Sequence, residues 1–168
     1  MMPRLHGERI VPTDSGCFIS PTALLSHWQG HRRLTRRVID VFPDDKFATF
    51  AVGGMRPFAE LANEMLLMAA PMVRGAVTGT WDTSVNRDLK TKAETLRWWD
   101  DSTEELNRLW PQIPAARFAE TVTAFGQYTD SLHNLILYVI DNEIHHRGQG
   151  YVYLRALGIA PPPFYERA

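Results

Sequence analysis

Apolar residues recur at spacings of three and four in four long segments, which is the period of an amphipathic helix. The segments cover about residues 21–42, 56–78, 91–110 and 114–157, and proline or glycine stands at or near most of their ends. Pro71 predicts a kink or a lost backbone hydrogen bond in the second segment, and Gly126 marks where the fourth can break. Because we find no credible strand run, the pattern predicts an all-α four-helix bundle forming a single domain over residues 1–168.

Both ends of the chain lack helical period. Residues 1–19 contain two prolines and two glycines and predict an irregular arm packed on the surface. Residues 159–168 contain three consecutive prolines, which predict a non-helical tail. The single cysteine, Cys17, lies in the arm, where one thiol predicts no disulfide and no base is identified beside it.

Composition excludes some classes of function. The formal net charge of −1 provides no basic field for nucleic acid, so we expect no nucleic-acid partner. No run of 18 apolar residues exists, so we expect no membrane-spanning helix. The N-terminal sequence lacks the apolar core of a signal peptide, and a cytoplasmic location is the default expectation.

The last predicted helix carries polar residues on its apolar face. Its seam begins with three apolar residues, turns polar for three positions and ends apolar: Leu132, Leu135, Val139, Asn142, His146, Gln149, Tyr153. Burying an amide or imidazole without a partner costs about 1–3 kcal/mol, so these positions need partners. Asn142 and His146 are four residues apart and share one side of the helix, as two ligands of one ion would. His145 lies about 100° around the helix, at the edge of this face.

Other segments offer counterparts to this seam. Glu64 lies about 60° from the centre of the apolar stripe of the second segment and can lean into the bundle. His31 falls within the stripe of the first segment, with His27 at its edge. A lone histidine on a core face is usually only hydrogen-bonded, whereas three adjacent polar seam positions are hard to satisfy by accident. The seam is therefore the stronger candidate site.

Two stretches resemble the DinB-like (damage-inducible) bundle family, and the resemblance covers nearly the whole chain. Residues 142–158 resemble its last-helix signature, in which His, three residues and a second His precede Arg-Gly-Gln and a leucine-rich turn. Residues 56–64 resemble its Glu-Leu-x-x-His segment. In that family three histidines typically bind a divalent metal, and their positions fall on Glu64, Asn142 and His146. Glutamate is a competent ligand for Zn or Ni, but an amide is a weak one.

The resemblance implies a metal-dependent enzyme acting on a small molecule. Transfer of a low-molecular-weight thiol is the preferred reaction and hydrolysis the second, with Zn or Ni as the ion. His31 or His145 would act as general base, and Gln149 would contact the bound cofactor or ligand. We also expect a homodimer, with Trp81 and Trp98 contributing apolar surface. The alternatives are a metal-free binding module and a structural dimer whose polar seam fixes helix register.

Overall fold

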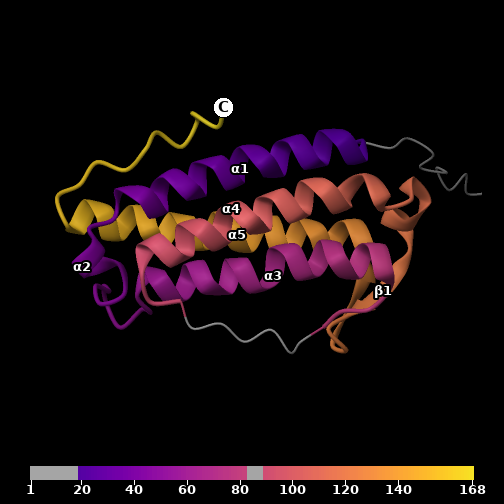
Figure 1. The fold of residues 1–168 in the computed structure, drawn as a ribbon, viewed down its shortest axis with the longest axis horizontal. Helices are drawn as coiled ribbons and strands as arrows, with labels where there is room; N and C mark the ends of the chain where they lie inside the picture. Colours follow the sequence, from indigo (N-terminus) through magenta and orange to yellow (C-terminus); the bar gives the residue numbers. More distant parts are fainter. Residues whose placement is uncertain (1–18, 83–88) are drawn as a thin grey trace, which may run out of the picture.

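The protein forms a bundle of four long helices, as predicted (Figure 1). The structure is a computed structural model that describes residues 19–82 and 89–168. The predicted arm up to residue 18, with Cys17, lies outside the described residues. The long helices are α1 (Pro21–Val41), α3 (Phe58–Thr78), α4 (Lys92–Leu109) and α5 (Leu132–Ala156).

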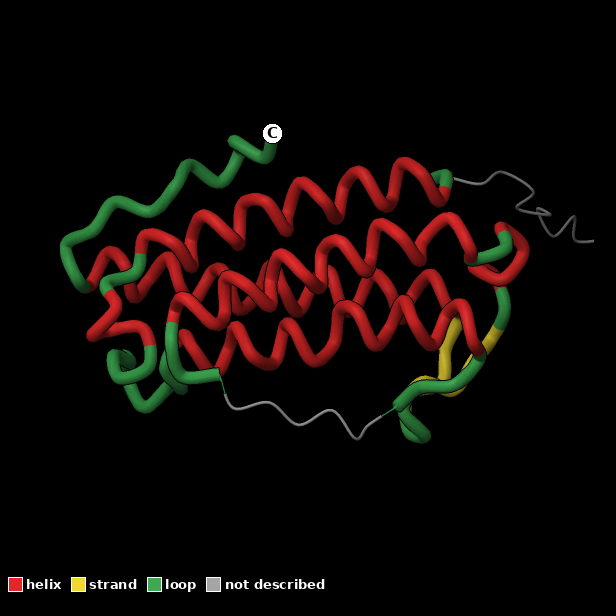
Figure 2. Tube along the Cα trace, viewed as in Figure 1, coloured by secondary structure: helices red, strands yellow, loops and turns green. Residues whose placement is uncertain are grey.

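The arrangement of the helices places α3 beside α5. Each of α1 and α3 packs against both α4 and α5. In Figure 1, α1 and α5 run in one direction and α3 and α4 in the other, so α3 and α5 are antiparallel neighbours. A short helix, α2 (Asp44–Phe47), lies between α1 and α3 at the end of the bundle away from the strands (Figure 2). Among the described residues no helix has the length and apolar character needed to cross a membrane.

Local signals fix where three of the helices begin or end. The Ser20 hydroxyl accepts a hydrogen bond from the Ala23 amide at 3.1 Å, which caps the first turn of α1. Thr91 caps α4 in the same way through the Glu94 amide at 3.2 Å. Gly79 ends α3 with φ of 79°, a left-handed conformation that glycine adopts without steric cost.

The prediction of one helix over 114–157 is wrong in its first part, and so is the expectation of no strands. α5 begins only at Leu132, after two short 3₁₀ helices, η1 (Trp110–Gln112) and η2 (Ala115–Ala119). Strands β1 (Thr121–Ala124) and β2 (Tyr128–Ser131) form an antiparallel hairpin between them and α5. Phe125 and Gly126 both have positive φ at its turn, at 54° and 70°. The β-branched residues in β1 favour a strand, and Gly126 supplies the turn.

Two clusters of buried apolar side chains fill the bundle. The cluster at the hairpin end includes Trp28, Trp110 and Ile136, and the cluster at the α2 end includes Phe58 and Tyr153. Along α1 and α5 the residues between the clusters are polar and buried: His31, Arg32, Thr35, Glu143, His146, Arg147. A polar layer therefore crosses the middle of the bundle.

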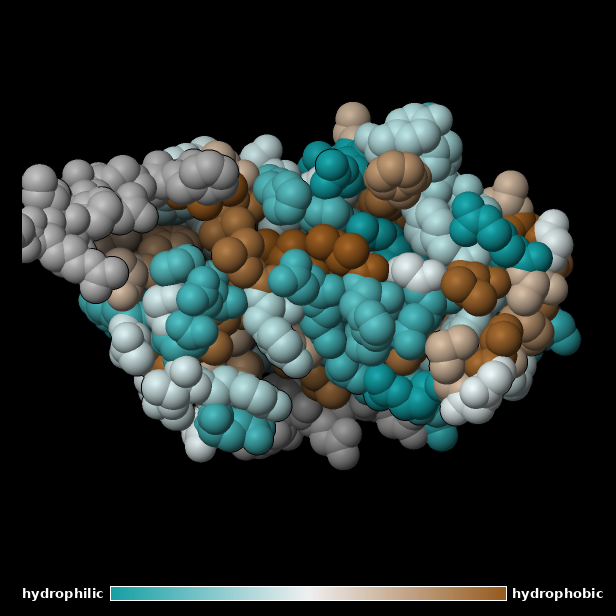
Figure 3. Space-filling model, turned by 180° about the vertical axis from the view of Figure 1, so that it is seen from behind, coloured by the Kyte–Doolittle hydropathy of each residue, from teal (hydrophilic) through white to brown (hydrophobic). Residues whose placement is uncertain are grey.

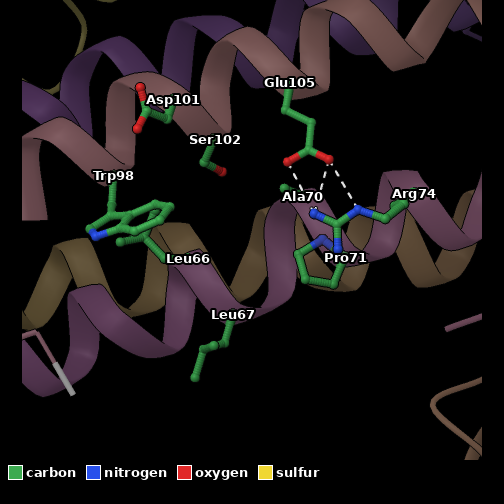
Figure 4. Close-up of a pocket in the computed structure, with 9 residues that line it drawn as sticks. All are labelled: Leu66, Leu67, Ala70, Pro71, Arg74, Trp98, Asp101, Ser102 and Glu105. Carbon is green, nitrogen blue, oxygen red and sulfur yellow. Dashed lines mark hydrogen bonds and ion pairs between the residues drawn. The ribbon is translucent and has the colours of Figure 1, made fainter. Parts of the chain in front are cut away.

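Pro71 remains inside α3 and lines a small cavity against α4 (Figure 4). Proline has no amide hydrogen, so the Leu67 carbonyl four residues earlier loses its helical partner. Figure 4 shows Ser102 and Trp98 on the opposite wall and Arg74 bridging Glu105 through two contacts of 3.0 Å. The cavity of about 50 Å³ has room for a few water molecules, so it is no candidate for a substrate site.

The predicted non-helical tail follows α5 and lies along α1 (Figure 1). Arg33 on α1 donates to the Arg167 carbonyl at 3.1 Å. The Tyr151 hydroxyl on α5 donates to the Pro162 carbonyl at 2.7 Å. These bonds hold the tail against the side of the bundle that faces away from α3.

Candidate metal centre and adjoining groove

Glu64 on α3 contacts two of the polar side chains on α5 that we identified from the sequence, Asn142 and His146. Its Oε1 atom lies 2.9 Å from His146 Nε2 and accepts a hydrogen bond from Asn142 Nδ2 at 3.0 Å. The antiparallel packing of α3 and α5 makes these contacts possible, because it turns the two polar faces toward each other. We call Glu64, Asn142 and His146 the Glu64 centre.

Gln149 orients the imidazole of the centre. Its Oε1 accepts a hydrogen bond from His146 Nδ1 at 2.7 Å, and its Nε2 lies 3.6 Å from the sulfur of Met55. Gln149 is one helical turn beyond His146, which lets the amide reach back to the ring. A histidine that binds a metal usually donates its other ring N–H to such an acceptor, which fixes the tautomer and the ring orientation.

Arg56, in the loop before α3, supplies the carboxylate of the centre with a counter-charge. Its guanidinium donates to Glu64 Oε2 at 2.6 Å. Burial alone would raise the pKa of Glu64, but hydrogen bonds from Arg56, His146 and Asn142 outweigh it and lower the pKa to about 2. The Glu64 side chain is 33% exposed and that of Arg56 49%, so water reaches this pair and weakens it.

The residues of the centre fit a divalent cation with nitrogen and oxygen ligands. The 2.9 Å between His146 Nε2 and Glu64 Oε1 resembles the separation of two neighbouring ligands of one ion, which is about 3 Å when each lies about 2.0–2.2 Å from the metal. Asn142 Oδ1 is buried and has no hydrogen-bond partner among the described residues, which leaves a neutral oxygen donor beside them. Within the described ranges no three His, Cys, Asp or Glu side chains form a metal-binding group, so a third protein ligand at this centre would have to be the Asn142 amide.

A groove of about 680 Å³ begins at Glu64 and extends along α3 and α5 to the hairpin. Its α3 wall is formed by Glu64, Leu67, Met68 and Met72, which follow one face of the helix. The other walls come from the hairpin and the first turns of α5: Phe125, Gln127, Tyr128, Thr129, Asp130, Asn134, Leu135, Tyr138. Pockets of this size and mixed lining hold small organic molecules. The row of methionines, interpreted from the sequence as core filling, thus also lines a groove.

The structure does not bring His31 to the Glu64 centre. The His31 ring contacts His27, Arg147 and Arg167, and these partners belong to α1, to the buried layer and to the tail. Burial, together with the positive charges of Arg147 and Arg167, lowers the pKa of His31 to about 3. His145 lies at the edge of the centre as expected, exposed and with its ring 5.0 Å from that of His146. Of the two candidate bases, only His145 adjoins the centre.

A second buried polar group, centred on Glu143, was not predicted. The Glu143 carboxylate accepts hydrogen bonds from Thr35 at 2.7 Å and Trp28 at 3.1 Å. Arg32 and Arg147 lie 3.8 and 3.9 Å from it, and burial lowers the pKa of both guanidinium groups. The i, i+4 spacing of Glu143 and Arg147 on α5 could have indicated this buried group from the sequence. Its partners on α1 could not have been found in that way, because only the fold brings them to Glu143.

Comparisons with known proteins agree with this architecture. A DinB-like protein from Bacillus subtilis has 21% sequence identity and a TM-score of 0.70, with 85% of this chain and 96% of that chain covered. A DinB-like protein from Bacillus cereus has 17% identity and a TM-score of 0.68, with 86% and 97% covered. At these identities the likeness establishes the fold alone. None of the curated proteins compared with the sequence matches it.

The sequence itself matches the model of the DinB family over residues 18–168, which include α1, α3, α4 and α5. The match spans nearly the whole chain and includes both segments on which the resemblance was based. The chain therefore belongs to the DinB family.

Proposed function

We propose that this protein binds a divalent cation at the Glu64 centre and a small molecule in the adjoining groove. The observation that carries the proposal is the meeting of Glu64, Asn142 and His146 around one carboxylate oxygen at the end of a groove of about 680 Å³. His146 Nε2 and Glu64 Oε1 would be the stronger ligands and Asn142 Oδ1 the weaker one. Zn²⁺ or Ni²⁺ suits this mixture of nitrogen and oxygen.

The reaction that we infer is transfer of a small thiol, with hydrolysis as the second class. A bound divalent ion lowers the pKa of a thiol or a water molecule that it holds. Gln149 keeps His146 in one orientation, and Arg56 pairs with the second carboxylate oxygen of Glu64, Oε2. His145, exposed beside His146, would move a proton to or from the bound molecule.

A second candidate, a binding module without metal, is favoured by Arg56. Its guanidinium already neutralises Glu64 at 2.6 Å, so the carboxylate does not need an ion to offset its burial. In this alternative the Glu64 centre would bind a polar group of the ligand directly through hydrogen bonds. The two candidates differ in whether metal binds to the purified chain.

We also propose a homodimer, on different grounds from the exposed tryptophans expected from the sequence. Trp81 and Trp98 are partly buried and pack against the two apolar clusters, so they offer less free surface than expected. α5 instead exposes Leu137, Ile144 and Val152. Seen from behind, hydrophobic side chains form a band across the middle of the molecule, with hydrophilic ones below it (Figure 3). Such a band is typical of a surface that another chain covers.

Metal binding is tested by calorimetric titration of Zn²⁺ and Ni²⁺ into untagged protein that has been treated with a chelator. We expect one ion per chain and a loss of affinity of more than about tenfold in His146→Ala, because even the loss of a group that only orients a metal ligand costs about 10–100-fold. His133→Ala removes a histidine from the same helix outside the centre and serves as the matched control. No saturable binding to the wild-type chain would reject the metal and favour the binding module.

A further inference from the structure

The groove is elongated, and its middle is lined by apolar side chains. The α3 wall from Glu64 to Met72 spans eight residues, which is about 12 Å of helix. Its middle is apolar, because Leu67, Met68 and Met72 form the wall there, and Phe125 of the hairpin also lines the groove. A ligand that follows the groove must therefore be elongated and carry an apolar body, because polar groups there would lose their water without gaining partners.

The hairpin end carries a fixed negative charge. Asp130 Oδ1 accepts hydrogen bonds from the Ser131 amide at 2.6 Å and from Asn134 Nδ2 at 3.0 Å, which hold the carboxylate at the mouth of the groove. The bond from Asn134 and then that from Ser131 lower the pKa of Asp130, so the group is ionised at neutral pH. No lysine or arginine is among the described residues that line the groove.

Two tyrosine rings also line the groove. Tyr128 on β2 and Tyr138 on α5 stack with their centroids 6.4 Å apart and their planes 27° from parallel. Both remain about half exposed, at 49% and 56%. Exposed aromatic faces attract organic cations.

We propose that the groove selects an elongated organic cation, with an amine at the Asp130 end and an apolar body along Met68, Met72 and Phe125. The charge of the lining supports this choice, because an anionic group at this end would meet Asp130, and no lysine or arginine among the described lining residues offsets that repulsion. The inference rests on the proposed binding of a small molecule next to the Glu64 centre. An amine about 12 Å from that centre lies beyond the screening length of physiological salt, so it is compatible with a metal ion there.

The test uses three probes that share a phenylalkyl body and differ in the charge of the head group: 4-phenylbutylamine, 4-phenylbutan-1-ol and 4-phenylbutanoate. Their affinities for the full chain are measured by ligand-observed NMR at low salt without added metal. We expect the amine to bind about tenfold more tightly than the carboxylate, with the alcohol between them. Asp130→Asn should reduce the preference to about threefold or less, while the exposed control Glu104→Gln keeps it.

A second variant covers the case in which Asp130→Asn disturbs the hairpin. Gln127→Lys places a cation in the exposed turn of the groove lining and leaves Asp130 in place, and it should lower the affinity for the amine while raising that for the carboxylate. Equal affinities of the wild-type chain for amine and carboxylate, or no binding of the amine up to its solubility limit, would overturn the inference. His146→Ala should weaken metal binding by more than about tenfold and keep the amine preference, so failure of the metal centre and failure of this inference give different results.

Discussion

The Glu64 carboxylate can pair with Arg56 or bind a metal ion, and replacing Arg56 by glutamine separates these two roles. In the structure the guanidinium is the nearest cation to Glu64, at 2.6 Å from Oε2. A divalent ion at Oε1 would lie roughly 6 Å from that guanidinium, and the repulsion with full water screening is about 1.4 kcal/mol. Because that repulsion disappears in Arg56→Gln, the variant should bind Zn²⁺ or Ni²⁺ about tenfold more tightly than the wild-type chain.

The same substitution should have only a small effect on the metal-free protein. The pair is partly exposed on both sides, so its loss costs about 0.2–1 kcal/mol of unfolding free energy. Competition with a chelator measures the metal affinity, and thermal unfolding with and without the ion measures the stability. Arg36→Gln, which removes an arginine paired with Asp100 elsewhere on the bundle, is the matched control. A metal affinity that is unchanged or weaker in Arg56→Gln would refute the reasoning.

Three further predictions concern the fold that supports the centre. Glu143→Gln leaves Arg32 and Arg147 buried without their carboxylate and should lower the unfolding free energy by about 3–5 kcal/mol in chemical denaturation, against less than about 0.5 for the exposed Glu104→Gln. Gly150→Ala places a Cβ 2.5 Å from the Phe58 ring and should cost about 1–3 kcal/mol, whereas Gly148→Ala on the same helix meets open space and should stabilise by about 0.5–1 kcal/mol; equal effects would contradict the packing. Because folding lowers the pKa of Glu64 from 4.5 to about 2, its carboxylate stabilises the fold above pH 4.5 and loses that effect as the pH falls toward 2. The excess stability of wild type over Glu64→Gln should thus be about 1–2 kcal/mol at neutral pH after solvent screening and vanish near pH 2, and a constant difference across this range would contradict it.

Helical period and capping residues were sufficient to predict three of the long helices to within a few residues. Ser20, Thr91 and Gly79 make the contacts or adopt the conformation that their types suggest, and these are local effects. The start of α5 was missed because the apolar residues before it were assigned to the helix. Strand alternation in Thr121–Ala124 and the glycine at 126 were the competing signals, and short hairpins give few residues from which to recognise them.

The part of the candidate site that could be predicted from the sequence consists of residues whose direction follows from helical spacing. Asn142, His146 and Gln149 share a face of α5, and the inward lean of Glu64 followed from its angle to the α3 stripe. Arg56 was missed because it belongs to a loop, where no periodicity indicates direction. The partners of Glu143 were missed for a related reason, since they lie on α1 and only the packing of the bundle brings them to it.

X-ray absorption at the metal edge of nickel-loaded, untagged protein tests the metal centre most directly, because it measures the atoms around the ion. The Glu64 centre predicts nitrogen and oxygen neighbours at about 2.0–2.2 Å, with the scattering of a single imidazole and no sulfur. That imidazole signal should disappear in His146→Ala and persist in His133→Ala. Two or more imidazoles around the ion, or a signal unchanged by His146→Ala, would show that the metal binds elsewhere and would contradict the proposed centre.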